Sequence, residues 1–420
     1  TMAELAINGA TPVRTNPYPR WPVWDDSERS GLLDVLDSGD WWATEGTKVG
    51  EFEEAWGRFH RTGPAAAVTN GTHAIELALT AVGVGEGDEV IVPAWSFLAT
   101  ASAVLMVNAV PVFVDVDPRN GCIDVAAVGA AITERTRAVA VVHVAGSVAD
   151  MDALTELCTR RDLAIVEDCA HAHGSTWKGL PVATLGDAGT FSFQHSKLMT
   201  AGEGGAVVSR RPEVIEEVSS LADCGRRPGR WFYSHYILGG NYRLTEWQAA
   251  VLLAQLERFP DQQARRSANA DHLNKALAEI PGVEPQWRDP RCTSQGNYCY
   301  VVRVRPEEFG AGREQVRLAL EAEGIPLTMS YPPLHHLEAF LDPDGFAPRY
   351  RNRAGMQDFG SLDLPVVKAL ADETLWFKTS VLMGDRSDCD DVVTAVNRIH
   401  RHASELADLE VAEPGTGGRR

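Results

Sequence analysis

The sequence predicts an α/β protein with a large, mostly parallel sheet domain followed by a smaller α+β C-terminal domain. Short β-branched runs alternate with helix-like stretches between residues 65 and 210, which is the rhythm of βαβ units. The pattern changes after residue 297, where a strand is followed by helices and loops. The chain has 420 residues and is 44% hydrophobic, so it is long enough for two or three packed domains.

The first half of the chain supplies the strands and helices of the large domain. Four apolar runs are short and rich in valine and isoleucine, which is typical of strands buried on both faces. We expect these strands at residues 89–93, 110–115, 138–143 and 163–167. The stretches beside them predict helices at 73–82, 98–107, 124–132 and 151–161.

Polar side chains lie at or just after the ends of three predicted strands. They are Asp115, His143 and Asp168. Open α/β sheets bind ligands beyond the carboxyl ends of their strands. These positions therefore indicate the edge of the sheet where a site would lie.

The second half of the chain contains the expected domain boundary. Residues 245–280 predict one long helix or two helices separated at Pro260. Gly282, Pro285 and the polar stretch 288–296 indicate a boundary, so we divide the chain into a large domain at 1–285 and a small domain at 286–410. The small domain is expected to contain a strand at 298–305 and helices at 313–323 and 388–408. The Gly-rich and Arg-rich tail at 411–420 is expected to be disordered.

Charge and cysteine usage narrow the class of partner. The formal net charge is −19, which repels phosphate backbones and anionic lipid, so we expect neither nucleic acid nor membrane as a partner. No apolar run approaches the roughly 20 residues needed to span a bilayer. The seven cysteines are widely spaced without a CxxC pair. This is typical of reduced thiols in a cytoplasmic protein and gives no metal-ligand pattern.

One motif could bind a phosphate. Residues 69–73 (TNGTH) follow a strand and open a helix, so Gly71 and Thr72 would offer backbone N–H groups, a hydroxyl and a favourable dipole. An ordinary helix cap explains the same residues, because Asn and Thr are common at helix starts.

Two further motifs carry a carboxylate and a lysine. Asp168 follows the apolar run 163–167 and could keep a ring nitrogen protonated, or it could be a structural acid that caps the next turn. Lys197 stands between a predicted strand and the glycine-rich stretch 202–205, and it is one of only six lysines beside 33 arginines. A partly desolvated lysine loses its proton more readily and can form a Schiff base with an aldehyde.

An aromatic residue completes the set. Trp95 or Phe97 follows the strand 89–93 and could stack on a flat heterocycle, although either ring could simply pack in the core. A phosphate cradle, a stacking ring, an acid and a lysine nucleophile are the parts that pyridoxal phosphate needs.

The sequence resembles the DegT/DnrJ/EryC1/StrS family of sugar and aminocyclitol aminotransferases, from about residue 21 to about 400. The matching stretches are 85–93 (GEGDEVIVP), 111–117 (PVFVDVD), 167–174 (EDCAHAHG), 191–205 (FSFQHSKLMTAGEGG) and 240–243 (GNYR). The resemblance implies the type I, aspartate-aminotransferase-like fold of pyridoxal-phosphate-dependent transferases. It also implies a homodimer with active sites at the interface.

The resemblance assigns roles residue by residue. Lys197 would carry the cofactor and shuttle the proton, and Asp168 would pair with the pyridine nitrogen. The other cofactor-binding residues implied are Phe97 as the stacking ring, His171 near the ring hydroxyl, Gly71, Thr72, Ser192 and Gln194 at the phosphate, and Asn241 at the phosphate of the neighbouring subunit. Asn70 stands where many relatives have Ser. Some relatives have His at the lysine position and act as dehydratases, whereas Lys197 is retained here.

The resemblance leaves the reaction open between related chemistries. Residues 107–115 and 146–152 are similar to scyllo-inosose aminotransferases, whereas 41–46, 69–74 and 223–227 are similar to 3-amino-5-hydroxybenzoate synthase. We expect transfer of an amino group from L-glutamine or L-glutamate to a cyclic polyhydroxy ketone in antibiotic or other secondary-metabolite biosynthesis. The alternatives are dehydration with aromatisation, and a non-catalytic sensor that binds pyridoxal phosphate.

Several residues are candidates for contacting the substrates. The guanidinium groups of Arg226, Arg227 and Arg230 could bind the carboxylate of the donor, although a solvated loop explains any one of them better. Four other residues could line the pocket for the ketone or could pack elsewhere: Trp42, Tyr331, His335 and His336.

Overall fold

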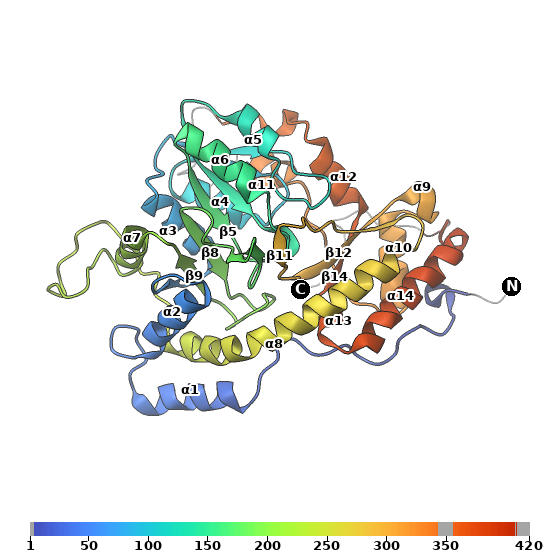
Figure 1. The fold of residues 1–420 in the computed structure, drawn as a ribbon, viewed down its shortest axis with the longest axis horizontal. Helices are drawn as coiled ribbons and strands as arrows, with labels where there is room; N and C mark the ends of the chain where they lie inside the picture. Colours follow the sequence, from blue (N-terminus) through green and yellow to red (C-terminus); the bar gives the residue numbers. More distant parts are fainter. Residues whose placement is uncertain (1–3, 343–355, 408, 410–420) are drawn as a thin grey trace.

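The computed structural model describes residues 4–342, 356–407 and 409 (Figure 1). The tail 411–420, which we predict to be disordered, lies outside the described residues. So does residue 410, the last residue of the predicted small domain. Within the described part of the chain, no helix is both long and apolar enough to cross a membrane.

A seven-stranded sheet forms the larger unit, in the order β1-β9-β8-β5-β4-β2-β3. Its strands are β1 (Ala66–Val68), β2 (Glu89–Pro93), β3 (Val110–Val114), β4 (Thr136–Val142), β5 (Ala164–Asp168), β8 (Ala188–Ser192) and β9 (Gly205–Val208). All neighbouring pairs from β8 to β3 are parallel, and only β9 runs in the opposite direction. The predicted parallel sheet is therefore confirmed, with each predicted strand end within two residues of the observed one.

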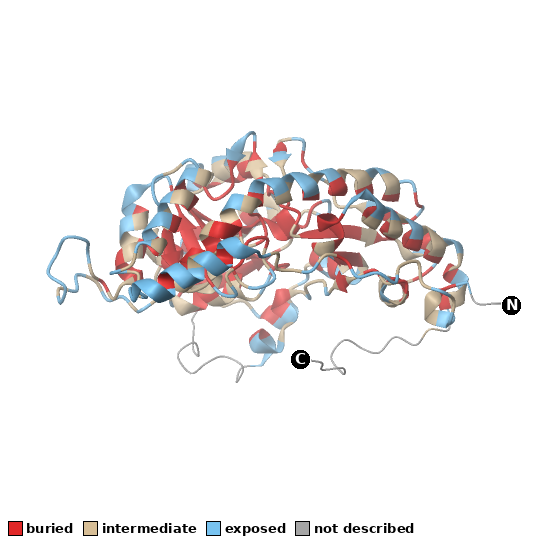
Figure 2. Ribbon diagram, turned by 90° about the horizontal axis from the view of Figure 1, so that it is seen from below, coloured by how far each residue is buried: buried red, intermediate tan, exposed pale blue. Residues whose placement is uncertain are grey.

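The helices of this unit cover the sheet because its strands are apolar on both faces. They are α2 (Lys48–Phe59), α3 (Gly71–Ala81), α4 (Ala99–Met106), α5 (Val125–Ala131), α6 (Met151–Arg161) and α7 (Pro212–Ala222). Every residue of β2, β3, β8 and β9 is buried, and Figure 2 shows these buried strands between half-exposed helices. The predicted helices are all present, and α3 begins two residues earlier than expected.

A four-stranded antiparallel sheet forms the second unit, in the order β10-β12-β14-β13. Its strands are β10 (Val283–Pro285), β12 (Cys299–Val304), β13 (Leu327–Thr328) and β14 (Thr374–Lys378). The helices beside them are α9 (Pro306–Phe309), α10 (Arg313–Ala322), α12 (Pro365–Glu373), α13 (Ser380–Met383) and α14 (Arg386–Arg401). The short helix α11 (Glu338–Leu341) instead packs on the large sheet, where Phe340 meets Phe113 of β3. The last helix, expected at 388–408, ends at Arg401, and a short 3₁₀ turn over Ala403–Leu406 follows it.

One long helix, α8 (Glu246–Leu277), joins the two units. Pro260 lies inside it, so of the two alternatives the single helix is observed. Proline removes a backbone donor and disfavours helix, but both halves of α8 are held by packing. The first half contacts α1 (Asp26–Ser38) and α2, and the second half contacts α13 and α14 (Figure 1).

The two units have separate apolar cores. Leu252 and Phe259 of α8 belong to the core of the large sheet, whereas Leu273 and Leu277 belong to the core of the small sheet. Leu5, near the start of the chain, also packs in the second core. The domain boundary at 285/286 stays a proposal, and α8 is the element that fixes one unit against the other.

A small three-stranded sheet lies beside these units. It consists of β6 (Thr176–Trp177), β7 (Leu180–Pro181) and β11 (Cys292–Ser294), in the order β11-β6-β7. β6 and β11 are antiparallel, so this sheet links the large unit to the segment that enters the small unit.

Candidate active site

A cavity of about 630 Å³ opens beyond the carboxyl ends of β5 and β8. Both units line it, the small unit through Tyr298, Thr328, Tyr331 and Trp376. Eight of the nine predicted cofactor-binding residues line this cavity: Gly71, Thr72, Phe97, Asp168, His171, Ser192, Gln194 and Lys197. The position is the one expected for a ligand of an open α/β sheet.

Lys197 follows β8 in a tight turn, where its backbone N–H donates to the carbonyl of Gln194 at 2.8 Å. Its Nζ lies 4.7 Å from the centroid of the Tyr298 ring. Burial lowers the pKa of Lys197 from 10.5 to about 8, because the charged form loses its solvent; Asp168 and Cys299 partly oppose the shift. A larger share of this amine is therefore free base near neutral pH than for an ordinary lysine.

The start of α3 presents unpaired backbone donors to the same cavity. Asn70 caps the helix, and its Oδ1 accepts from the N–H of His73 at 2.9 Å. The N–H groups of Gly71 and Thr72 have no acceptor among the described residues. A Cβ on Gly71 would lie 2.7 Å from the Cβ of Ser192, so only glycine allows the helix to start this close to β8. The two interpretations of this motif are compatible, since Asn70 is the cap and the next two residues can still bind an anion.

Asp168 ends β5 and is 6% exposed. Its Oδ2 accepts from the Thr100 hydroxyl at 2.8 Å and its Oδ1 accepts from the N–H of Ala170 at 3.1 Å. Because an ionised carboxylate only accepts, Thr100 must donate to it, and the Ser96 hydroxyl, 2.9 Å from that of Thr100, must donate to Thr100. These donors fix the orientation of the carboxylate.

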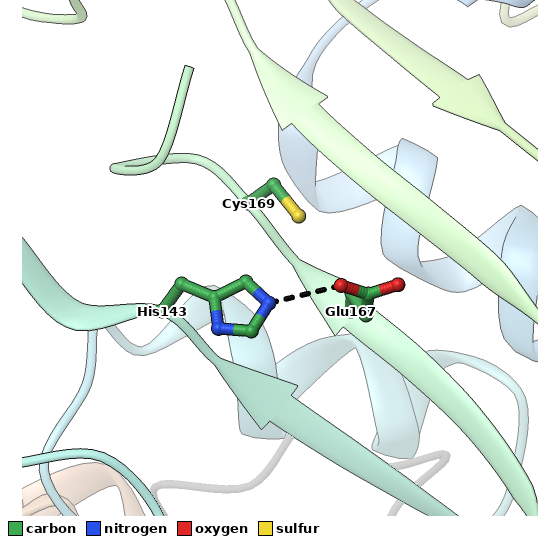
Figure 3. A group of neighbouring side chains, drawn as sticks. All are labelled: His143, Glu167 and Cys169. Atoms are coloured by element: carbon green, nitrogen blue, oxygen red, sulfur yellow. Dashed lines mark hydrogen bonds and ion pairs between the residues drawn. The ribbon is translucent and has the colours of Figure 1, made fainter. Parts of the chain in front are cut away.

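A buried group next to Asp168 supports its strand. His143, Glu167 and Cys169 have potential ligand atoms within 4.8 Å of one another (Figure 3). The Glu167 carboxylate already accepts from His143 Nε2 at 3.0 Å and from three backbone N–H groups, those of Ala183, Leu185 and Gly186. We therefore assign this group a structural role, in which it holds the end of β5 against the loop before β8.

Aromatic rings form the wall of the cavity around His171. The His171 ring stacks on Tyr298 with centroids 4.1 Å apart, and its Nε2 lies 3.0 Å from the Tyr331 hydroxyl. Burial, followed by the charge of Lys197 and by His173, holds the pKa of His171 well below its usual range. Phe97 is 57% exposed and lines the cavity with one face open.

The sequence was also compared with known proteins. Residues 24–386 match the DegT/DnrJ/EryC1/StrS aminotransferase family. The chain belongs to this family. It is therefore an enzyme, an aminotransferase, and the resemblance and the fold class predicted from the sequence are confirmed.

The chain is similar over nearly its whole length to several named proteins. An L-glutamine:2-deoxy-scyllo-inosose aminotransferase of Streptoalloteichus tenebrarius is 42% identical over 96% of this chain and 99% of its own. The enzyme of that name from Micromonospora echinospora is 38% identical over 96% of this chain and 100% of its own. The crystal structure of 3-amino-5-hydroxybenzoic acid synthase is 36% identical with a TM-score of 0.84, covering 93% of this chain and 100% of that chain.

Some predicted residues of this aminotransferase do not line the cavity. Asn241 is exposed and lies opposite Asp223 in an isolated bridge. Arg226 pairs with Asp223 at 3.0 Å, and Trp42 packs edge-on against Phe232. Arg227, Arg230, His335 and His336 are also absent from the cavity lining, so Tyr331 is the one proposed substrate-pocket residue that lines it in the described chain.

Other residues of the site are not predicted from the sequence. Thr100 donates to Asp168, and Ser96 bonds to Thr100; their hydroxyls, four residues apart after a strand end, are a usable signal. Tyr298 and Trp376 reach the cavity from the small sheet. Their positions depend on how the two units pack, which no local pattern records.

Proposed function

We propose that this enzyme is a pyridoxal-phosphate-dependent aminotransferase that transfers the amino group of L-glutamine or L-glutamate to a cyclic polyhydroxy ketone. A keto-cyclitol in antibiotic biosynthesis is the substrate class that the named relatives support. The observation that carries the proposal is that Lys197, with its lowered pKa, and the oriented carboxylate of Asp168 share a cavity with the unpaired N–H groups of α3. The seven cysteines are unpaired and six are buried, which supports the proposed cytoplasmic location.

The residues present fit pyridoxal phosphate. Gly71 leaves room where a Cβ would meet Ser192, and the free N–H groups of Gly71 and Thr72 suit a phosphate. Phe97 offers an open aromatic face. When bound, the cofactor would supply an aldehyde for amine exchange and a ring that accepts electrons.

Each residue of the site would have its own role in the reaction. Lys197 would hold the cofactor in the resting enzyme, and its amine, when free, would carry the proton that moves during amine transfer. Asp168 would hold a proton on the ring nitrogen. The start of α3, with Ser192 and Gln194, would bind the phosphate. The aromatic wall of Tyr298 and Trp376 would keep water from the reacting atoms.

We further propose that the active unit is a homodimer. Among the described residues that line the cavity, Lys197 is the only lysine and there is no arginine, whereas the donor brings a carboxylate. The segment 223–242 projects from the body of the molecule beside α7 (Figure 1) and carries the three candidate arginines and Asn241. It also exposes Trp231 (72%), Tyr233 (67%) and Leu238 (101%). Exposed apolar groups of this extent indicate an interaction surface. A second copy of the chain would cover these side chains and would bring its candidate arginines to the cavity.

Asn241→Ala should weaken cofactor binding about tenfold, which is the loss expected for one hydrogen bond to a charged group. Titration of the apoenzyme with pyridoxal phosphate measures this affinity. The decisive control is a hybrid dimer with one Asn241→Ala chain and one Lys197→Ala chain. Because one site then receives both changes and the other receives none, one site per dimer should bind with wild-type affinity. A hybrid with no wild-type site would contradict the shared cavity.

The rate at which the apoenzyme captures pyridoxal phosphate should depend on pH through Lys197. Only the free amine attacks the aldehyde, so the rate should rise with pH as the ammonium loses its proton and level off above about pH 8. A lysine at its ordinary pKa would be only roughly 0.3% free base at pH 8. Stopped-flow absorbance between pH 6 and 10 measures the profile. A rate that keeps rising tenfold per pH unit to pH 10 would contradict the lowered pKa.

The function itself is tested by the two half-reactions taken separately. The loaded enzyme should lose its absorption band when L-glutamine or L-glutamate is added and regain it when 2-deoxy-scyllo-inosose follows, with the cyclitol amine identified by mass spectrometry. The second candidate function, dehydration with aromatisation, is favoured by the similarity to 3-amino-5-hydroxybenzoic acid synthase. It predicts a product that has lost water and absorbs in the ultraviolet. Absence of amine exchange with every donor would refute the proposed function.

A further inference from the structure

The direction of a buried chain of hydrogen bonds can be read from its first donor. The backbone N–H of Ala145 lies 3.3 Å from His171 Nδ1. A backbone N–H only donates, so Nδ1 carries no proton. His171 is neutral in this setting, since burial and Lys197 hold its pKa well below the usual range. Its single ring proton is therefore on Nε2, which donates to the Tyr331 hydroxyl oxygen at 3.0 Å.

This assignment leaves the proton of the Tyr331 hydroxyl without an acceptor among the described residues. The oxygen accepts from His171, so its own O–H must point elsewhere, and Tyr331 lines the cavity that holds Lys197 and Asp168. Burial raises the pKa of the Tyr331 phenol well above its usual value. The group is therefore a protonated donor at neutral pH.

The Tyr331 ring is held firmly in this position. Its backbone carbonyl accepts from Trp95 Nε1 at 3.0 Å, and its ring packs edge-on against Trp376 with centroids 5.2 Å apart. The planes of Tyr331 and His171 differ by only 8°. Trp95 belongs to the large unit and Trp376 to the small unit, so the hydroxyl is fixed by both and loses little conformational entropy when it binds.

We propose that the Tyr331 hydroxyl donates a hydrogen bond to an oxygen of the molecule bound in the cavity, and that His171 is a positioning residue that acts through Tyr331. The inference rests on the proposed function and adds a specificity-determining donor to that site. A neutral O–H donor suits a neutral or weakly charged oxygen. Two sources have that chemistry: a ketone or hydroxyl oxygen of the cyclic substrate, and the ring oxygen of the cofactor.

Tyr331→Phe removes the donor and keeps the ring, and Tyr300→Phe is its matched control. Tyr300 is buried, and its hydroxyl bonds to Asn274 Oδ1 at 3.0 Å, away from the cavity. We expect Tyr331→Phe to lose about 10- to 100-fold in kcat/KM, the usual effect of leaving a buried polar group unpaired. Tyr300→Phe should stay within about twofold of wild type.

Measurements of cofactor binding and of the ketone half-reaction in Tyr331→Phe distinguish the source of the oxygen. If it belongs to the cyclic substrate, cofactor affinity and the absorption spectrum stay unchanged, and only the ketone half-reaction slows. If it belongs to the cofactor, the affinity falls and the pH titration of the absorption band shifts before any substrate is added. Either result supports the donor role.

The relay through His171 is tested by a double-mutant cycle. If His171 acts through Tyr331, adding His171→Phe to Tyr331→Phe should cost little more than Tyr331→Phe alone. In His171→Gln the amide N–H can replace Nε2–H, so this variant should retain most of the activity. It also tests the relay if the His171→Phe variant does not fold. Fully additive losses would contradict the relay.

The outcomes separate this inference from the proposed function. If wild type exchanges amines but Tyr331→Phe behaves like Tyr300→Phe in both half-reactions and in the spectrum, the Tyr331 role is refuted alone. If wild type itself exchanges no amine with L-glutamine or L-glutamate, the proposed function fails and the Tyr331 role fails with it.

Discussion

Lys197→Ala should abolish turnover, with a loss of about 10⁴-fold or more, because no other group of the described cavity can both bond to an aldehyde and carry the proton. The fold should remain intact. Lys197 is half-buried and its burial lowers its pKa, so its removal relieves a desolvation cost and should leave the melting temperature unchanged or slightly higher. Steady-state kinetics and thermal denaturation of the apoenzyme measure the two effects.

The matched control for this prediction is Lys178→Ala. Lys178 is exposed and its Nζ pairs with Asp152 at 2.6 Å, far from the cavity lining. An exposed ion pair contributes little to stability, so this variant should keep wild-type activity. Turnover retained in Lys197→Ala would remove the basis for the proposed chemistry.

Asp168→Ala should lower the rate of both half-reactions by about 10²- to 10⁴-fold, the range expected when a positioned proton-holding group is lost. Without the carboxylate, nothing holds a proton on the ring nitrogen, and a neutral ring accepts electrons poorly. The ¹⁵N chemical shift of labelled cofactor reports that protonation directly. It should move toward the value of a neutral pyridine in the variant.

Two further variants distinguish this loss of activity from a folding defect. Asp168→Asn keeps an acceptor for the Thr100 hydroxyl and for the Ala170 N–H, so it should fold like wild type and still lose activity. Asp117→Asn, which breaks the surface pair with Arg119, should be active. Near-normal rates in both Asp168 variants would rule out the assigned role.

The parallel sheet is predictable because its strands carry their own signal. Residues 89–93 coincide with β2. A short run of apolar β-branched residues between turn-forming residues is typical of a buried strand. The helix predicted at 151–161 likewise coincides with the observed element, α6. Residues that follow such strands, Asp168 and Lys197 among them, can then be placed at one edge from topology alone.

Elements held by distant contacts are harder to predict. α1 and α2 contain glycines, which lower helix propensity, and both helices are held by packing on α8. In α2 a Cβ on Gly57 would lie 2.0 Å from the carbonyl oxygen of Gly63, so only glycine fits there. The continuity of α8 through Pro260 likewise depends on neighbours that are far away in the sequence.

The same distinction applies to the site. The catalytic candidates lie in motifs, whereas Tyr298 and Trp376 reach the cavity, and Thr100 reaches Asp168, only through the packing of distant elements. Asn241 and the candidate arginines do not line the cavity of the single chain. A prediction of the whole cavity therefore needs the packing of both units, and its completion needs the second copy that we propose.

The most direct test of the account is to reduce the loaded wild-type enzyme with borohydride and map the modified peptide by mass spectrometry. Reduction makes the bond between the lysine and the cofactor permanent. We predict one pyridoxyl group per chain, attached to Lys197 and to none of the other five lysines. A label on another lysine, or no label at all, would contradict the central claim.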